Sequence, residues 1–189
     1  MKKNIIIAAL CLLSTTIFAQ TWTVDKAHSR LAFSITHLSI AELGGTFNSF
    51  DAKFTSSKPD FTDAVIELTA DVNSIDTDND QRDTHLKSPD FFDAQKNPNF
   101  TFKSTSLKKV SDKKYKLSGD LSLHGVTRPV VLDVVLNGTT THPMSKKQVA
   151  GFKITGIIKR TDFGIATATP TAMLSDEVAL VANAEFTKE

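Results

Sequence analysis

Residues 115–123, YKLSGDLSL, place apolar side chains at alternate positions and polar ones between most of them. Successive side chains of an extended strand point to opposite faces, so this pattern describes a strand with one covered and one wet face. The same alternation recurs in residues 65–72 (VIELTADV), 130–136 and 178–186. Segments of this kind spread along the whole chain predict an all-β protein.

Further strand candidates bring the expected total to eight or nine; they are residues 30–37, 46–54, 99–110 and 149–160. Turn-forming pairs such as Asn137-Gly138 separate them. Short antiparallel strands in series form a sandwich or an up-and-down barrel. A short helix is expected near residues 78–88, capped by Asp76 or Asp78, and residues 161–176 fit no period and indicate a long loop.

The first 19 residues have the pattern of a secretory signal peptide, with Lys2 and Lys3 followed by an apolar run and a small residue, Ala19, at the expected cut. Cys11, the only cysteine, lies inside this segment. No later apolar run approaches the roughly 18 residues of a membrane-spanning helix. We therefore expect residues 20–189 to form one domain in the bacterial periplasm, without a transmembrane segment.

The charge balance excludes a nucleic-acid-binding protein. The 189 residues carry 22 Lys and Arg against 21 Asp and Glu, for a net charge of +1, whereas such proteins need a clustered basic surplus. Lysines do gather around residues 108–116. We interpret them as a solvated turn, with a weak, transient contact with anionic membrane lipid as the alternative.

Phenylalanine dominates the aromatic residues, with 13 Phe against one Trp and one Tyr. Phe has no polar atom that needs a partner, so this surplus suits either an ordinary dry core or the wall of an apolar cavity. Phe91, Phe92, Phe100 and Phe102 follow the expected helix and are placed to line or cover a barrel mouth. An eight-stranded barrel is either filled by its own side chains or holds one small ligand. At roughly 0.8 kcal/mol per buried methylene, a long alkyl chain would bind tightly there.

Few polar residues stand out as candidates for a site. His37 shares its parity with the apolar residues of segment 30–37, which predicts a position on the covered face as a core histidine, a head-group contact or a metal ligand. Arg82 and His85 would share one face of the helix, where they either tie it to the barrel through a carboxylate or meet an anionic head group. None of the histidines shows a zinc-binding spacing, so no metal site is expected.

Nine short motifs occur in a fixed order: residues 22–25 (WTVD), 28–29 (HS), 33–37 (FSITH), 45–47 (GTF), 74–77 (SIDT), 82–93 (RDTHLKSPDFFD), 98–100 (PNF), 119–127 (GDLSLHGVT) and 160–164 (RTDFG). Together they resemble the YceI-like, polyisoprenoid-binding family of bacterial exported proteins. The resemblance implies an eight-stranded antiparallel, lipocalin-like barrel that binds a long isoprenoid or another amphiphilic lipid. It implies no catalytic residues, and it favours a homodimer.

The resulting expectation is periplasmic binding, transport or sequestration of a long-chain lipid, with no cofactor besides that ligand. The apolar residues expected to contact the tail are Leu31, Phe33, Ile35, Phe91, Phe92, Phe100, Phe102, Leu121, Leu132, Phe152 and Phe163. The polar candidates for the head group are His37, Arg82, His85 and Arg160. Two alternatives remain: a stress-related interaction protein whose barrel is self-filled, and an enzyme acting on a lipid or quinone intermediate with His37 or His85 as acid–base.

Overall fold

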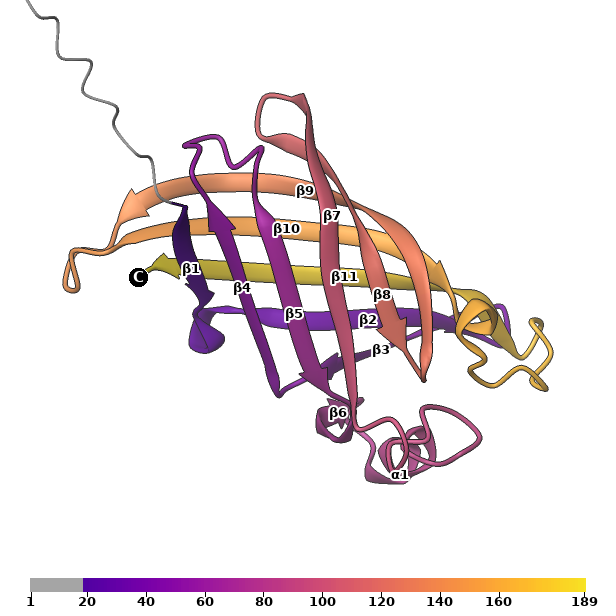
Figure 1. Cartoon of the computed structure of the whole chain (residues 1–189). Helices are drawn as coiled ribbons and strands as arrows, with labels where there is room; N and C mark the ends of the chain where they lie inside the picture. The colour runs from indigo at the N-terminus through magenta and orange to yellow at the C-terminus, as the bar shows by residue number, and fades with distance from the viewer. Residues whose placement is uncertain (1–18) are drawn as a thin grey trace, which may run out of the picture.

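The computed structural model describes residues 19–189, so the expected signal peptide lies outside the described residues except for Ala19 (Figure 1). The described chain is a single antiparallel sheet with one α-helix and three short 3-10 helices. The elements are β1 (Gln20–Val24), η1 (Lys26–His28), β2 (Arg30–His37), β3 (Ala41–Phe47), β4 (Phe50–Ser56), β5 (Val65–Asp71), η2 (Val72–Ser74), β6 (Ile75–Asp76), α1 (Asp80–Leu86), β7 (Asn99–Ser111), β8 (Lys114–Leu123), β9 (Val126–Thr141), β10 (Gln148–Lys159), η3 (Arg160–Phe163) and β11 (Leu174–Lys188).

The sheet closes on itself through β1, which pairs with both β4 and β11. The ring of β1, β4, β5, β7, β8, β9, β10 and β11 therefore contains eight strands. β2 continues the line of β1 along β11, since Val24 lies opposite Phe186 and Arg30 lies opposite Asn183. β3 pairs with β2 and leads into β4 in the same way. This arrangement confirms the predicted eight-stranded antiparallel barrel with one short helix.

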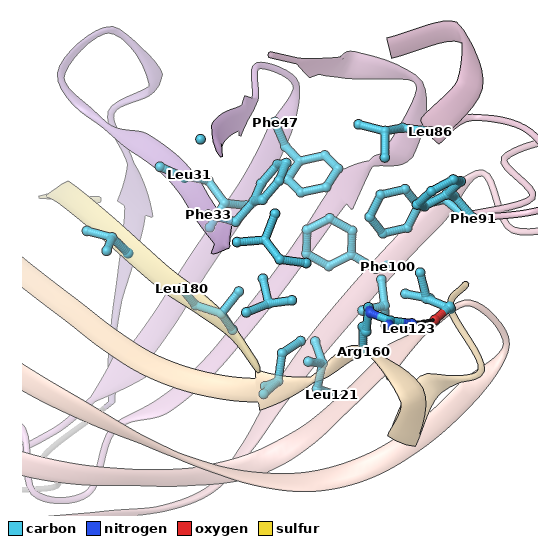
Figure 2. A pocket seen from close by; sticks show the side chains of 18 of the residues that line it. Leu31, Phe33, Phe47, Leu86, Phe91, Phe100, Leu121, Leu123, Arg160 and Leu180 are labelled. Carbon is cyan, nitrogen blue, oxygen red and sulfur yellow. Dashed lines mark hydrogen bonds between the residues drawn. The ribbon is translucent and has the colours of Figure 1, made fainter. Parts of the chain in front are cut away.

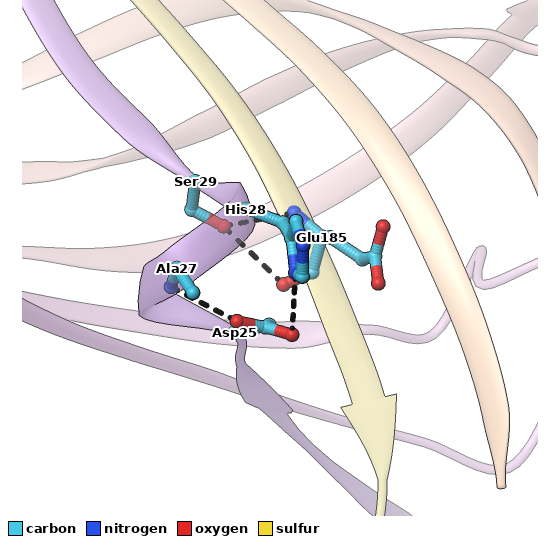
Figure 3. A network of polar contacts seen from close by, with 5 residues as sticks. All are labelled: Asp25, Ala27, His28, Ser29 and Glu185. Atoms are coloured by element: carbon cyan, nitrogen blue, oxygen red, sulfur yellow. Dashed lines mark hydrogen bonds and ion pairs between the residues drawn. The ribbon is translucent and has the colours of Figure 1, made fainter. Parts of the chain in front are cut away.

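A hydrogen-bonded bend joins β1 to β2 (Figure 3). The Asp25 carboxylate accepts from the backbone N–H of Ala27 at 2.9 Å and contacts His28 Nδ1 at 2.9 Å. Ser29 Oγ accepts from the backbone N–H of Glu185 at 2.9 Å, where the ladder to β11 is interrupted. Ser29 and His28 thus have separate structural partners at this bend.

Three sequence-based expectations about elements need correction. Residues 46–54 are two strands, because Asn48 donates to Asp76 Oδ2 and the Ser49 N–H donates to Ser74 Oγ, which turns the chain between them. The helix is capped by Asn79, whose side chain accepts from the Arg82 N–H at 2.9 Å. The expected loop 161–176 is shorter than predicted, since η3 occupies its start and β11 begins at Leu174.

One end of the barrel is sealed by aromatic rings. Phe54 stacks on Trp22 with ring centroids 5.4 Å apart and meets Phe61 and Phe186 edge-on. Phe152 completes this cluster, 5.8 Å from Phe54. Aromatic pairs of this kind contribute about 0.5–1.5 kcal/mol each beyond the area that they bury. The sealed end leaves the opposite end, next to α1, as the one that can open.

Candidate functional site

A cavity of about 1170 Å³ occupies the barrel interior and reaches the end covered by α1 and residues 164–174 (Figure 2). Small-molecule sites in proteins usually measure about 300–1,000 Å³. The cavity is therefore larger than a compact metabolite needs. Its presence argues against a barrel filled by its own side chains.

The wall of the cavity is built from alternate positions of the strands. β2 contributes Leu31, Phe33 and Ile35, and β7 contributes Phe100 and Phe102. Leu121 and Leu132 extend the wall across β8 and β9. Because the side chains of a strand alternate between faces, the parity seen in the sequence places these residues correctly on the inner surface. Their contact with a ligand remains a prediction.

The segment after α1 brings two phenylalanines over the mouth. The Phe92 N–H donates to the Leu86 carbonyl at 3.0 Å, and the Asp93 N–H donates to the Ser88 carbonyl at 2.9 Å. These bonds fold the chain back so that Phe91 and Phe92 line the cavity. The Phe92 ring meets the Phe47 ring edge-on at 6.0 Å.

Arg82 ties α1 to Thr77 in the connection that follows β6, so its partner is not the expected carboxylate of the barrel. Its Nε donates to Thr77 Oγ1 at 2.7 Å, and a second N–H donates to the Thr77 carbonyl. The buried Asp83 carboxylate accepts from the Thr77 N–H at 3.0 Å. Within residues 19–189 no ion pair includes Arg82. The guanidinium still lies on the cavity lining, beside the mouth.

Both candidate histidines lie at the mouth. His37 is exposed, which corrects the expectation of a covered position: β2 ends at His37, where the barrel opens to solvent. His85 is also exposed; its ring packs edge-on against Phe91 at 4.8 Å, and its Nε2 lies 3.8 Å from the Asp90 carboxylate. Both residues line the cavity and could contact a polar end group there.

Arg160 is only 2% exposed and uses all its hydrogen-bond donors within the protein. A guanidinium has five N–H groups, and here each has a backbone carbonyl as acceptor. The five acceptors belong to Ile165, Ala166, Thr169, Leu174 and Ser175. Arg160 lines the cavity, but it has no free N–H for a head group, which corrects its expected role. It instead holds the loop of residues 164–174 against the barrel.

Two other expected contacts are absent from the cavity wall. Phe152 belongs to the aromatic cluster of the sealed end, where its ring meets the rings of Phe54 and Phe61 edge-on. Phe163 is 1% exposed in the core, and its carbonyl contacts His124 Nδ1 at 3.0 Å. Neither is among the residues that line the cavity.

Several lining residues were not singled out from the sequence. Phe47, Leu123 and Leu180 line the cavity from strands, and Leu86 lines it from the helix (Figure 2). Leu123 and Leu180 follow the alternation of their strands, so their inner position could have been inferred. Residues 164–169 also line it, and they show no periodic signal that would have revealed them.

The bend between β1 and β2 carries the described chain's cluster of potential metal ligands. Asp25, His28 and Glu185 each place one ligand atom within 4.8 Å of the others (Figure 3). The hydrogen bond between His28 and Asp25 raises the pKa of His28 and lowers that of Asp25. Because Asp25 also caps η1, we assign this cluster a structural role in the bend.

None of the helices within residues 19–189 combines the length and apolar character needed to cross a bilayer.

The cavity presents a mostly apolar surface, and Arg82, His37 and His85 lie at its mouth.

Comparison with known proteins agrees with this architecture. The family model of the YceI-like domain matches residues 22–186. Protein YceI of Salmonella newport is 38% identical over 190 residues, which cover 98% of this chain and 97% of that relative. The crystal structure of the Campylobacter jejuni YCEI protein matches with a TM-score of 0.72 at 31% identity, over 82% of this chain and 90% of the other.

A more distant structure has the same fold. It is a polyisoprenoid binding domain from Saccharophagus degradans, described as implicated in plant cell wall breakdown. The two share 15% identity with a TM-score of 0.65, over 89% of this chain and 98% of that domain. At this identity the likeness concerns the fold alone.

Proposed function

The chain belongs to the YceI-like family, and from this premise we propose that it binds one long-chain isoprenoid or similar amphiphilic lipid inside its barrel. The expected signal peptide places this role in the periplasm, where the protein would carry or sequester the lipid. The observation that carries the proposal is the cavity of about 1170 Å³ with its wall of Leu, Ile and Phe side chains.

The apolar wall explains how an uncharged hydrocarbon ligand could be bound. Each methylene that moves from water to an apolar wall contributes roughly 0.8 kcal/mol, so affinity grows with the length of the buried hydrocarbon. The distribution of polar groups suggests an orientation. Arg82, His37 and His85 lie at the mouth, so the head group would stay there while the tail points to the sealed end.

Adjacent residues of β9 provide a matched test. Leu132 lines the cavity, whereas Val131 is exposed on the outer face. We expect Leu132→Trp to place an indole in the tail's path and weaken binding of a fluorescent long-chain prenyl analogue by about tenfold or more. Val131→Trp should bind it as the wild type does. Titration of the probe into detergent-free protein measures both affinities.

The two variants must also be compared as folded proteins, by circular dichroism and thermal unfolding. If both folded variants bind the probe with wild-type affinity, the tail does not occupy this part of the barrel. If folded wild-type protein binds no probe at all, the proposed function is wrong.

A further inference from the structure

The hairpin between β2 and β3 has an unusual tip. The Ile40 N–H donates to the His37 carbonyl at 3.1 Å, and the two residues between them, Leu38 and Ser39, have φ of 50° and 58°. Two successive positive φ values in a turn favour Gly, Asn or Asp, because a bulky side chain is disfavoured there. The β8–β9 tip, with the same signs of φ, uses Gly125 at its second position. At the β2–β3 tip, backbone preference does not explain the leucine.

This tip belongs to a cluster of exposed apolar side chains, which we call the apolar rim: Leu38, Ile40 and Met173. They are 48%, 86% and 52% exposed. The Leu38 N–H donates to the Met173 carbonyl at 2.9 Å, which holds the hairpin tip against the loop of residues 164–174. Single exposed apolar residues are ordinary, but a cluster on a fixed support marks an interaction surface.

The rim is uncharged and adjoins the cavity. Neither residues 38–41 (LSIA) nor residues 164–174 (GIATATPTAML) contain Asp, Glu, Lys or Arg. Met173, which accepts the hydrogen bond from Leu38, and His37, which precedes Leu38, both line the cavity. In Figure 1 the loop of residues 164–173 lies at the opposite end of the barrel from the β9–β10 hairpin. The apolar surface inside the barrel therefore continues here onto its outer edge.

We propose that the apolar rim docks the barrel mouth onto the surface of a phospholipid bilayer. This inference rests on the proposed function: a long-chain lipid resides in the bilayer, and its passage through water would expose its hydrocarbon at a cost for every methylene. If the rim inserts Leu38, Ile40 and Met173 among the acyl chains, the apolar interior of the barrel becomes continuous with the apolar interior of the bilayer. If the rim instead docked onto a protein, the lipid would still have to cross water between the bilayer and the barrel.

The chemistry of the rim also predicts how docking depends on salt. Insertion of uncharged side chains is driven by apolar burial, so it should persist at high ionic strength and need no anionic lipid. Contact through the lysines of the β7–β8 hairpin, around residues 108–116, would instead be screened by salt. Salt dependence thus separates the rim from the basic hairpin as the docking element.

The test compares the full mature chain with two variants. Leu38→Asp combined with Ile40→Asp places charges on the rim, and Asp tolerates positive φ, so the turn should be retained. Met144→Asp is the control, since Met144 is 84% exposed on the β9–β10 hairpin. Co-sedimentation with phosphatidylcholine vesicles at low and high salt measures docking. Retention of a preloaded prenyl probe without vesicles measures ligand binding separately.

We expect the wild type and Met144→Asp to bind vesicles equally at both salt concentrations, and the rim variant to bind at least about tenfold more weakly. All three proteins should retain the probe. Undiminished vesicle binding by the rim variant would overturn the proposal. The proposal would also be overturned if the wild type did not bind vesicles and instead formed a dimer that the rim variant did not form. The rim would then be the contact between two copies of the protein. Vesicle binding that follows this pattern with no probe retained in any protein would reject the lipid-binding function but support docking.

Discussion

Arg160 was expected from the sequence to contact a ligand head group, but in the structure it holds a loop in place. The sequence made it a candidate for a head-group contact, yet its donors are all satisfied by carbonyls of residues 165–175. No spacing in the sequence reports this, because the acceptors are backbone atoms of a loop without periodicity. Its charge remains buried next to the cavity, while its hydrogen bonds fix the loop that carries Met173.

We predict that Arg160→Lys lowers the free energy of unfolding by about 2–4 kcal/mol, because an ammonium has three donors and lacks the planar fork. Urea unfolding measures the change. Arg128→Lys is the matched control, since Arg128 is exposed and its Nε makes one bond, to the Asp162 carbonyl at 3.2 Å. Equal unfolding midpoints for the two variants would show that the five bonds of Arg160 do not hold the loop.

Other single residues mark the limit of sequence reasoning at this scale. The parity of residues 31–37 correctly placed Leu31, Phe33 and Ile35 inside, because alternation is a local property of a strand. The same parity put His37 on the cavity side, but it could not show that His37 is exposed, because exposure depends on where the barrel ends. Parity names the side of the sheet, and only the closed fold decides how deep each position lies.

At the scale of elements, the connection between β4 and β5 depends on one carboxylate. Asp63 accepts from the backbone N–H groups of Ser57 and Lys58 and from the hydroxyls of Ser56 and Ser57. Burial acts to raise the pKa of Asp63, but these hydrogen bonds outweigh it and lower the pKa well below its ordinary value. The ionised carboxylate therefore stabilises this connection.

This shift predicts a pH dependence with a definite sign. Because the pKa of Asp63 is lower in the folded protein, its contribution is present above the unfolded value of about 3.9 and is lost as the pH falls below it. We expect Asp63→Asn to cost about 1–3 kcal/mol at neutral pH and less as the pH drops toward 2. Unfolding midpoints across this range measure the effect. Asp112→Asn, on the exposed β7–β8 turn, is the control for the loss of one carboxylate. An Asp63→Asn deficit that stays constant with pH would contradict the assignment.

The elements themselves were largely predictable, because periods of two and turn residues are local signals. The breaks between consecutive strands were not predictable in this way. The breaks after β1 and β3 depend on side chains such as Asp25, Ser29 and Asn48, which bond to segments distant in the sequence or to the local backbone. These breaks matter for the site, since they let β2 extend along β11 and β3 along β2, which carries the apolar rim away from the sealed end.

At the scale of the whole molecule, the barrel divides into a packed half and a hollow half. Phe54, Phe61 and Phe152 fill one end, whereas Phe33, Phe91, Phe100 and Phe102 line the cavity at the other; Phe186 packs on Phe54 and also lines the cavity, so it lies between the two halves. The surplus of phenylalanine was compatible with a dry core and with a cavity wall, and the structure contains both. Composition could not divide the rings between them, because the division follows from which strand ends meet when the sheet closes.

We propose that the hollow half holds one long-chain lipid. The most direct measurement is mass spectrometry of an organic extract from the wild-type protein, purified without detergent from its own periplasm. We expect about one long-chain lipid per protein molecule, absent from a control protein prepared in parallel. An extract without such a lipid, from folded protein that also takes up no long-chain prenol from vesicles, would contradict it.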